Sequence, residues 1–352
     1  MKRISTMLLA AILTASALTA CAGNAAAPSS ASESAAASVA VSAAPTQVKA
    51  GLAVLTTSAK STDAGENDGA AKSDSVVAAI MIGEDGKILA CNLDVLQSTI
   101  NFSKDGKILT DLATTFKTKQ ELKENYGMKA ASKIQKEWYE QANFLSAYVI
   151  GKTVEEVKGI AINEKGVATG SDLTASVTIK VPDYIAAIEK AAANAVETVA
   201  SPQDRLGLAM VDNIAKSKDA GENDGLAQTY TTYAAVTVGT DGKITGCALD
   251  ATQANVNFDA TGKITTDLSA AVKTKNELKD GYGMRAASKI GKEWYEQAAA
   301  YAAYVIGKTA DEVSGIAVDE SAKATDTELL AGVTVSVGDF NAVVAKAAAN
   351  AE

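Results

Sequence analysis

An internal repeat constrains the fold of this chain more than any other feature. Residues 51–195 align with residues 207–351 without a gap, so each residue of the first copy has its counterpart 156 positions later. A unit of about 150 residues can bury a core of its own, which favours two tandem domains over a solenoid of short repeats. We therefore expect domains at 51–198 and 204–352, joined by a short segment that contains Pro202.

The N-terminal residues have the pattern of a bacterial lipoprotein signal peptide. Lys2 and Arg3 precede an apolar run at 7–18 that is too short to cross a bilayer as a helix. The run ends in Leu-Thr-Ala followed by Cys21, the pattern that the lipoprotein signal peptidase cleaves. The alternative is an ordinary secretory signal peptide with a fortuitous cysteine. Because all parts occur in order, we expect residues 1–20 to be removed and Cys21 to carry lipid.

Residues 21–50 are rich in alanine and serine, a composition typical of a flexible tether. Each buried methylene of an acyl chain contributes about 0.8 kcal/mol, so several chains at Cys21 hold a protein on the membrane. No later segment reaches 18 continuous apolar residues. We expect the two domains to lie at the outer face of the cytoplasmic membrane, anchored by lipid.

Composition excludes several kinds of chemistry. The formal net charge of −9 argues against a nucleic-acid partner. The absence of histidine excludes histidine-ligated haem or zinc and the Ser-His-Asp triad. Any reaction must therefore use carboxylates, hydroxyls, amides or a bound cofactor. Cys91 and Cys247 hold equivalent positions in the two copies, and we expect two buried free thiols rather than a bridge.

Each copy reads as strands followed by helices, which predicts an α+β fold with an antiparallel sheet. In the first copy a β-rich run at 76–82, an Asp-Gly turn and a return run at 88–93 predict a hairpin, and we expect a third short strand at 100–102. Capping boxes at Thr118 and Thr153 predict two helix starts.

A helix is expected between Gly127 and Gly151, with Trp138 on its apolar face. Trp138 and its counterpart Trp294 are therefore expected to serve the core.

The segment at 174–181 alternates apolar and polar residues, which predicts a strand, and an amphipathic helix should follow from Pro182. Thr178 would lie on the polar face, four residues before that helix, and Thr334 repeats its position. Helix N-termini attract phosphate groups. Threonine is also a common strand residue, so this geometry leaves a purely structural role open.

The same region resembles the FMN-binding domain of the sodium-pumping NADH:quinone oxidoreductase and the Rnf complex. In that family FMN is linked through its phosphate to the threonine of an acid-x-x-Ser-Gly-Ala-Thr motif. This chain reads Asp172-Leu-Thr-Ala-Ser-Val-Thr178 and Glu328-Leu-Leu-Ala-Gly-Val-Thr334, with alanine and valine at two family positions. The resemblance implies cofactor-binding roles for Asp172, Ser176, Thr178, Glu328, Gly332 and Thr334.

The order of lipobox, tether and two such domains is similar to that of surface flavoproteins in Gram-positive extracellular electron transfer. The resemblance implies FMN attached to Thr178 and Thr334 by a flavin transferase. It also implies electron flow from a membrane NADH dehydrogenase and quinone to an extracellular acceptor, with the chain a carrier rather than a catalyst. Two alternatives stay open: a flavin-free binding or structural lipoprotein, and a precursor whose signal fragment is a peptide pheromone.

Four tyrosines are candidate neighbours of the flavin ring. Tyr126 and Tyr282 precede a Gly-Met helix break, where an aromatic side chain can line a cleft. Tyr139 and Tyr295 follow the two tryptophans.

An acidic loop at 63–69 recurs unchanged at 219–225. Its glycine spacing does not match an EF-hand, and we expect a turn that precedes a strand.

Overall fold

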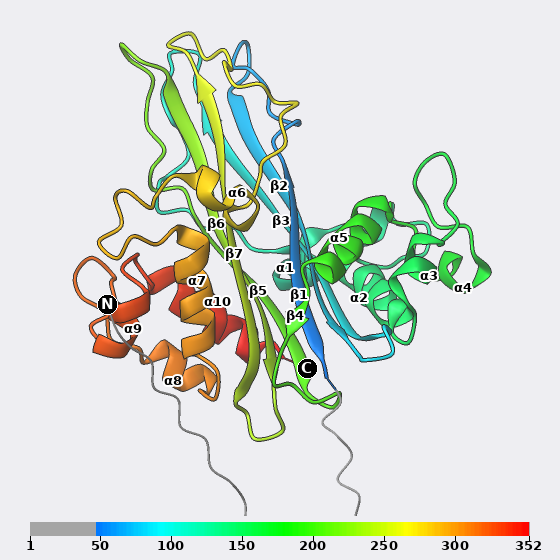
Figure 1. The fold of residues 1–352 in the computed structure, drawn as a ribbon. Helices are drawn as coiled ribbons and strands as arrows, with labels where there is room; N and C mark the ends of the chain where they lie inside the picture. Colours follow the sequence, from blue (N-terminus) through cyan, green and yellow to red (C-terminus); the bar gives the residue numbers. More distant parts are fainter. Residues whose placement is uncertain (1–46, 352) are drawn as a thin grey trace, which may run out of the picture. The chain divides into compact units, whose positions relative to one another are not determined.

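Two antiparallel sheets form the centre of the described chain (Figure 1). The first sheet has the order β3-β2-β1-β4 and consists of β1 (Lys49–Thr57), β2 (Gly69–Ile82), β3 (Ile88–Phe102) and β4 (Val196–Glu197). The second has the order β5-β6-β7 and consists of β5 (Arg205–Asn213), β6 (Gly225–Val238) and β7 (Ile244–Phe258). The fold is therefore α+β with antiparallel sheets, as the sequence predicts.

Helices follow the strands in each copy. The first copy has α1 (Lys119–Leu122), α2 (Trp138–Val149), α3 (Val154–Lys158), α4 (Ser171–Thr174) and α5 (Pro182–Ala193), with 3-10 turns at Lys123–Tyr126 and Lys129–Ala131. The second has α6 (Lys275–Leu278), α7 (Trp294–Tyr304), α8 (Ala310–Ser314), α9 (Thr327–Gly332) and α10 (Gly338–Ala349), with a 3-10 turn at Lys279–Tyr282.

The computed structural model describes residues 47–351, which belong to one compact unit. The expected signal peptide, the lipid site Cys21 and nearly all of the tether lie outside the described residues. Among residues 47–351, no helix combines the length and apolar character that crossing a bilayer requires.

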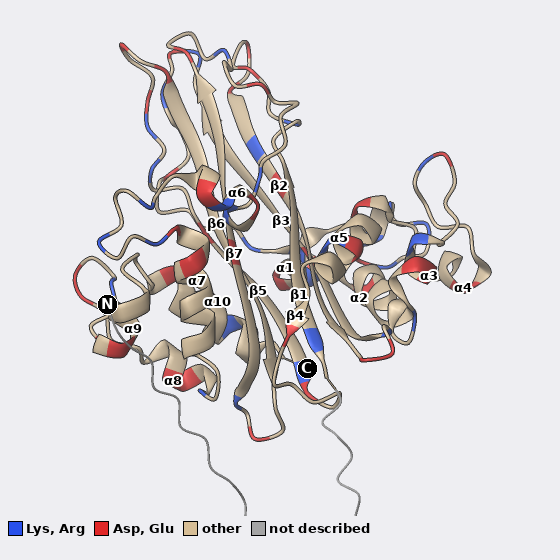
Figure 2. Ribbon diagram, in the orientation of Figure 1, with Lys and Arg blue, Asp and Glu red and all other residues tan. Residues whose placement is uncertain are grey.

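Each sheet is buried on both faces. One face of the first sheet packs on α2 and α5, with Ala53 and Ile80 in that core, and α7 and α10 cover the second sheet in the same way. The opposite faces of the two sheets pack against each other through residues such as Leu52 and Leu208. Figure 2 shows that charged residues lie mainly in helices and loops, which leaves the strands free to form this interface.

Reciprocal contacts join the two copies. Phe102 stacks on Phe258, with ring centroids 4.3 Å apart and planes at 10°. The two acidic loops make equivalent contacts with the opposite copy. Asp63 accepts a hydrogen bond from the Ile264 N–H and Asp219 accepts one from the Ile108 N–H, each at 2.8 Å. The loops at 63–69 and 219–225 thus precede strands, as expected, and each also clamps the other copy.

Several local predictions are confirmed. Thr118 and Thr153 form capping boxes, and Pro182 lies in the first turn of α5. The Asp-Gly turn joins β2 and β3, with Gly86 at a φ of 75°.

The prediction of a strand at 174–181 is wrong. The segment continues from α4 into irregular backbone, and one isolated bridge joins Val167 to Lys180. Val177 and Val181 are fully buried. The alternation of apolar and polar residues therefore reflects burial in the core rather than pairing in a sheet.

Two other boundaries differ from expectation. The runs at 88–93 and 100–102 are parts of the single strand β3, which pairs with β2 along its whole length, and Ser98 between the two runs contacts Thr229 of the second sheet. The helix expected after Gly127 begins only at Trp138. Gln135 has a left-handed backbone conformation, with a φ of 53°, which is incompatible with a continuous α-helix before that point.

Candidate functional site

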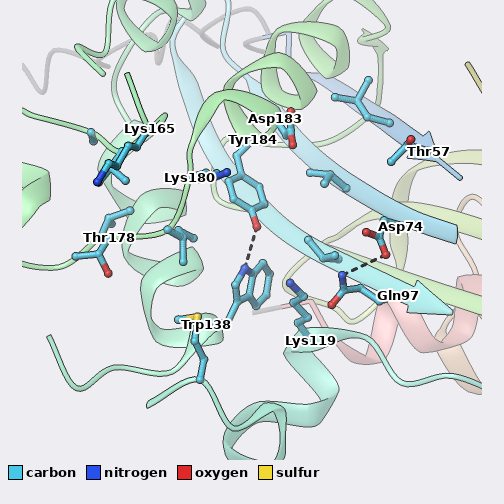
Figure 3. Close-up of a pocket in the computed structure, with 18 of the residues that line it drawn as sticks. Thr57, Asp74, Gln97, Lys119, Trp138, Lys165, Thr178, Lys180, Asp183 and Tyr184 are labelled. Atoms are coloured by element: carbon cyan, nitrogen blue, oxygen red, sulfur yellow. Dashed lines mark hydrogen bonds between the residues drawn. The ribbon is translucent and has the colours of Figure 1, made fainter. Parts of the chain in front are cut away.

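A cleft of about 1650 Å³ lies beside the threonine of the first copy. This volume exceeds the 300–1,000 Å³ that is usual for small-ligand sites, at roughly the scale of a cofactor with room for solvent. Its lining comes from β1 to β3, from the loops around Lys165 and Thr178, and from Trp138 and Tyr184 (Figure 3). The second copy adds Val272 and nearby residues, so both copies build this one cleft.

The charge of the cleft is opposite to that of the whole chain. Its lining includes the lysines Lys60, Lys119, Lys133, Lys165, Lys180, Lys190 and Lys273, and the acids Asp74, Glu164, Asp183 and Glu277. Two of these acids are already paired: Asp74 binds Lys60 at 2.6 Å and Glu277 binds Lys190 at 2.8 Å. The remaining surplus of cations suits an anionic ligand.

A buried glutamine holds the backbone at Thr178. The Gln141 side-chain oxygen accepts the Thr178 N–H at 2.8 Å, the Ile179 N–H at 3.1 Å and the Thr178 hydroxyl at 3.2 Å. Gln141 has no exposed surface, and its amide donates to Ser132 and to the Lys136 carbonyl. These N–H groups therefore bond to a side chain rather than to a neighbouring strand.

The second copy repeats this arrangement with small changes in distance. Gln297 accepts the Thr334 N–H at 2.8 Å, the Val335 N–H at 3.1 Å and the Thr334 hydroxyl at 3.3 Å. Thr178 and Thr334 are both half-buried. Neither glutamine was predicted from the sequence, although each lies three residues after a buried tryptophan and so on the same face of its helix.

Aromatic side chains form part of the cleft wall, with Lys119 over the Trp138 ring (Figure 3). Trp138 is 2% exposed and donates its indole N–H to the Tyr184 hydroxyl at 2.8 Å. Burial raises the pKa of the Tyr184 phenol above its ordinary value. Lys119 lies 4.5 Å from the ring centroid of Tyr126 and 5.3 Å from that of Trp138. The cleft therefore combines cations that suit a phosphate with aromatic side chains that suit a planar ring.

A buried carboxylate positions Tyr126 and the break that follows it. Glu137, at 3% exposed, accepts the Met128 N–H at 2.8 Å and the Lys129 N–H at 2.9 Å. Glu137 is also the N-cap of α2. One side chain thus joins the start of the helix to the loop that carries Tyr126.

The remaining predicted site residues divide into two groups. Tyr126 lines the cleft with Thr178, as the sequence suggested. Ser176 lies two residues before Thr178, outside the cleft lining, and accepts a hydrogen bond from the Lys136 ammonium at 3.2 Å. Tyr139 instead donates to Glu124 at 2.8 Å, outside the cleft lining. Asp172 is exposed on α4 and is also outside the lining.

In the second copy, Glu328 is exposed and Gly332 is half-buried on α9. Tyr282 is half-buried with Lys275 over its ring at 4.5 Å. Tyr295 packs against the core of that copy.

Both cysteines are free thiols and both tryptophans are core residues, as expected, but only one of the two cysteines is buried. Cys91 is buried and Cys247 half-buried, and both are free thiols. Their apolar surroundings raise each pKa to about 12, so neither is a thiolate near neutral pH. Trp138 and Trp294 belong to the two helix-covered cores. Within residues 47–351, no group of three or more Cys, Asp or Glu side chains is arranged to hold a metal ion.

The fold and the cleft define an α+β protein with a cationic, partly aromatic ligand site. Comparisons with family models, curated proteins and solved structures yield no match to this chain.

Proposed function

We propose that this chain is a lipid-anchored flavoprotein that carries electrons, with FMN attached through phosphoester bonds to Thr178 and Thr334. The observation that carries the proposal is the position of Thr178, whose side chain lines a cleft with a surplus of lysines and an aromatic wall. The two copies would each be an FMN-binding-like domain. The resemblance of the acid-to-threonine motif to the FMN-binding family supports the same assignment.

The residues of the cleft fit an FMN group. Lys165 and Lys180 are brought together by the Val167–Lys180 bridge, on the same side of the cleft as Thr178 (Figure 3), and suit a phosphate. Tyr126, which is half-buried beside Lys119, offers aromatic surface to a flat ring system. When bound, FMN supplies one- and two-electron redox chemistry, and the protein orients the ring and tunes its surroundings.

A carrier role follows from what the chain lacks and from its expected anchor. Without histidine, and with both core thiols protonated near neutral pH, the chain has few groups for acid–base or nucleophilic work of its own. A lipid at Cys21 and a tether would let the flavins approach a membrane NADH dehydrogenase and quinone as donors and an extracellular acceptor. A flavin transferase would supply the cofactor.

Intact-mass measurement tests the attachment. The chain isolated from a host with a flavin transferase should exceed its polypeptide-plus-lipid mass by two FMN groups, each less one water. Thr178→Val should remove one group and Thr334→Val the other. Thr174→Val is a matched control, because Thr174 lines the same cleft but occupies a position that the motif leaves unspecified. Unmodified wild-type protein from that host would refute the assignment and favour the flavin-free binding lipoprotein.

The anchor has a separate test. Cys21→Ser should prevent lipidation and move the protein from the membrane fraction to the medium or to an unprocessed form. If the variant stays membrane-bound after processing, the anchor lies elsewhere. Release of a peptide from the signal segment, followed by mass spectrometry of the medium, tests the pheromone alternative.

A further inference from the structure

The two threonine sites differ at one position deep in the cleft. In the first copy Asp74 of β2 occupies it and binds Lys60 at 2.6 Å and the Gln97 amide at 3.2 Å. These contacts draw Asp74 toward Lys60 and Gln97, and Lys119 stays half-buried at the edge of the cleft. The counterpart of Asp74 in β6 is Tyr230.

Tyr230 covers the lysine that corresponds to Lys119. The Lys275 ammonium donates to the Tyr230 hydroxyl at 2.9 Å. It also lies 4.6 Å from the centroid of the Tyr230 ring, 4.5 Å from that of Tyr282 and 5.0 Å from that of Trp294. Lys275 is only 4% exposed. Burial, reinforced by nearby Lys216, lowers its pKa to about 7, in keeping with an ammonium withdrawn from water.

Two further differences separate the sites. The opposite copy contributes Val272 to the wall of the first cleft, through a bridge to Thr56, whereas its counterpart Phe116 packs against the clusters that the two copies share. The lysines at 165 and 180 are replaced by Ser321 and Ser336, whereas Val167 is replaced by Lys323, so this part of the second site has one cation fewer for an anion.

We propose that Tyr230 and Lys275 form an internal plug that closes the Thr334 site while the Thr178 site stands open. An anionic aromatic ligand therefore enters the first site before the second. This inference rests on the proposed function only for the class of ligand, because the plug is made of the protein's own side chains. Tyr230 is the residue that sets the difference.

The chain contains a reporter for each site, because its only two tryptophans are Trp138 and Trp294. In Trp294→Phe only the first site is visible by fluorescence, and in Trp138→Phe only the second. Quenching of tryptophan emission is measured during titration of the full-length, unflavinylated protein with FMN. A parallel titration uses anilinonaphthalene sulfonate, an anionic aromatic probe that is not a flavin.

We expect half-maximal quenching of Trp138 at a ligand concentration at least about tenfold lower than for Trp294. Tyr230→Asp should bring Trp294 to within about threefold of Trp138, because Lys216 then gains the partner that Lys60 has in the first copy. Tyr230→Phe is the matched control. It keeps the ring, loses the hydroxyl that binds Lys275, and should leave the second site mostly closed.

The reverse change gives an independent answer if Tyr230→Asp does not fold. Asp74→Tyr should close the first site and raise the concentration that quenches Trp138 at least about tenfold, while Asp74→Asn should not. Equal quenching of both tryptophans in the wild type, or no effect of either tyrosine exchange, would overturn the plug. If the sulfonate distinguishes the sites and FMN binds neither, the plug stands and the flavin assignment fails.

Discussion

At the scale of single residues, a buried glutamine decides the geometry around each candidate threonine. Gln141 accepts three hydrogen bonds from Thr178 and Ile179 and donates two to the loop before α2. The threonine hydroxyl is thereby fixed relative to the helix that carries Trp138. A site on irregular backbone needs such support, since no neighbouring strand supplies it.

Replacing this glutamine should destabilise the fold and release the threonine segment. Gln141→Met keeps the length of the side chain but leaves the Thr178 and Ile179 N–H groups without an acceptor, at a cost of about 1–3 kcal/mol for each buried group. Urea denaturation measures the loss. Gln135→Met, at an exposed position in the preceding loop, should change the free energy of unfolding by less than about 0.5 kcal/mol. Equal stability of Gln141→Met and the wild type would show that the glutamine does not hold the segment.

Lys275 makes the stability of the protein depend on pH. Its pKa is about 7 in the folded chain against an ordinary 10.5, so between these values the unfolded chain binds more protons. The free energy of unfolding contributed by Lys275 therefore rises as pH increases from about 7 towards 10.5, and is lowest below that window. Lys275→Met should remove this rise in denaturation curves compared with the wild type, while Lys119→Met should retain it. An unchanged slope in Lys275→Met would contradict the burial of the ammonium.

At the scale of elements, close approach of a strand and a helix fixes where α5 and α10 lie. A side chain at Gly51 would overlap the backbone oxygen of Ala191, and one at Gly207 would overlap that of Ala347. The helices are held there by their own polar residues, with Lys190 donating to the Val54 carbonyl at 2.7 Å. Because α5 starts directly after the Thr178 segment, this contact also fixes one side of the cleft.

Gly51→Ala should therefore separate β1 from α5. We expect a loss of about 3 kcal/mol or more in the free energy of unfolding, since neither backbone can yield easily. Gly65→Ala is a suitable control, because a methyl group there meets nothing within 4 Å. Thermal unfolding followed by circular dichroism compares the two. A Gly51→Ala protein as stable as Gly65→Ala would mean that the strand and helix are not in this close contact.

At the scale of the whole molecule, the two copies have separate cores and also share two. Residues from both copies make up the cluster between the sheets and a second cluster around Phe102 and Phe258. Ion pairs cross in both directions, Lys190 to Glu277 at 2.8 Å and Lys346 to Glu121 at 2.7 Å. The sequence predicts halves that fold alone, and the shared cores add that each half would expose an apolar sheet face.

Separated halves should therefore bind each other. Chains covering 47–198 and 204–351, expressed apart, should self-associate or aggregate and should form a one-to-one complex when they are mixed. Phe258→Ala should weaken that complex by about 3–5 kcal/mol, as loss of a buried ring does. Phe144→Ala, at a partly exposed position outside the interface, should not weaken it. Analytical ultracentrifugation decides the case, and two stable monomers without mutual affinity would refute it.

The sequence by itself determined the elements that local chemistry specifies. Capping boxes, Asp-Gly turns and the proline at the start of α5 act over a few residues, so Thr118, Gly86 and Pro182 could be interpreted correctly from the sequence. The repeat likewise predicts that the same order of strands and helices occurs in both copies. A ligand site at Thr178 and Thr334 was suggested by their spacing from the following helix and by resemblance to a family.

Only the tertiary structure decided which side chains contact one another and which surfaces cover the sheets. The 174–181 alternation resembles a strand, but the partner of Thr178 is Gln141, 37 residues away, and no local pattern encodes that pairing. The second face of each sheet is buried only because the other copy packs against it. Alternation of apolar and polar residues along a strand predicts one buried face, but it does not show what covers the opposite face. The open first cleft and the closed second site differ for the same reason: Asp74 and Tyr230 acquire their effects from lysines that only the folded chain brings beside them.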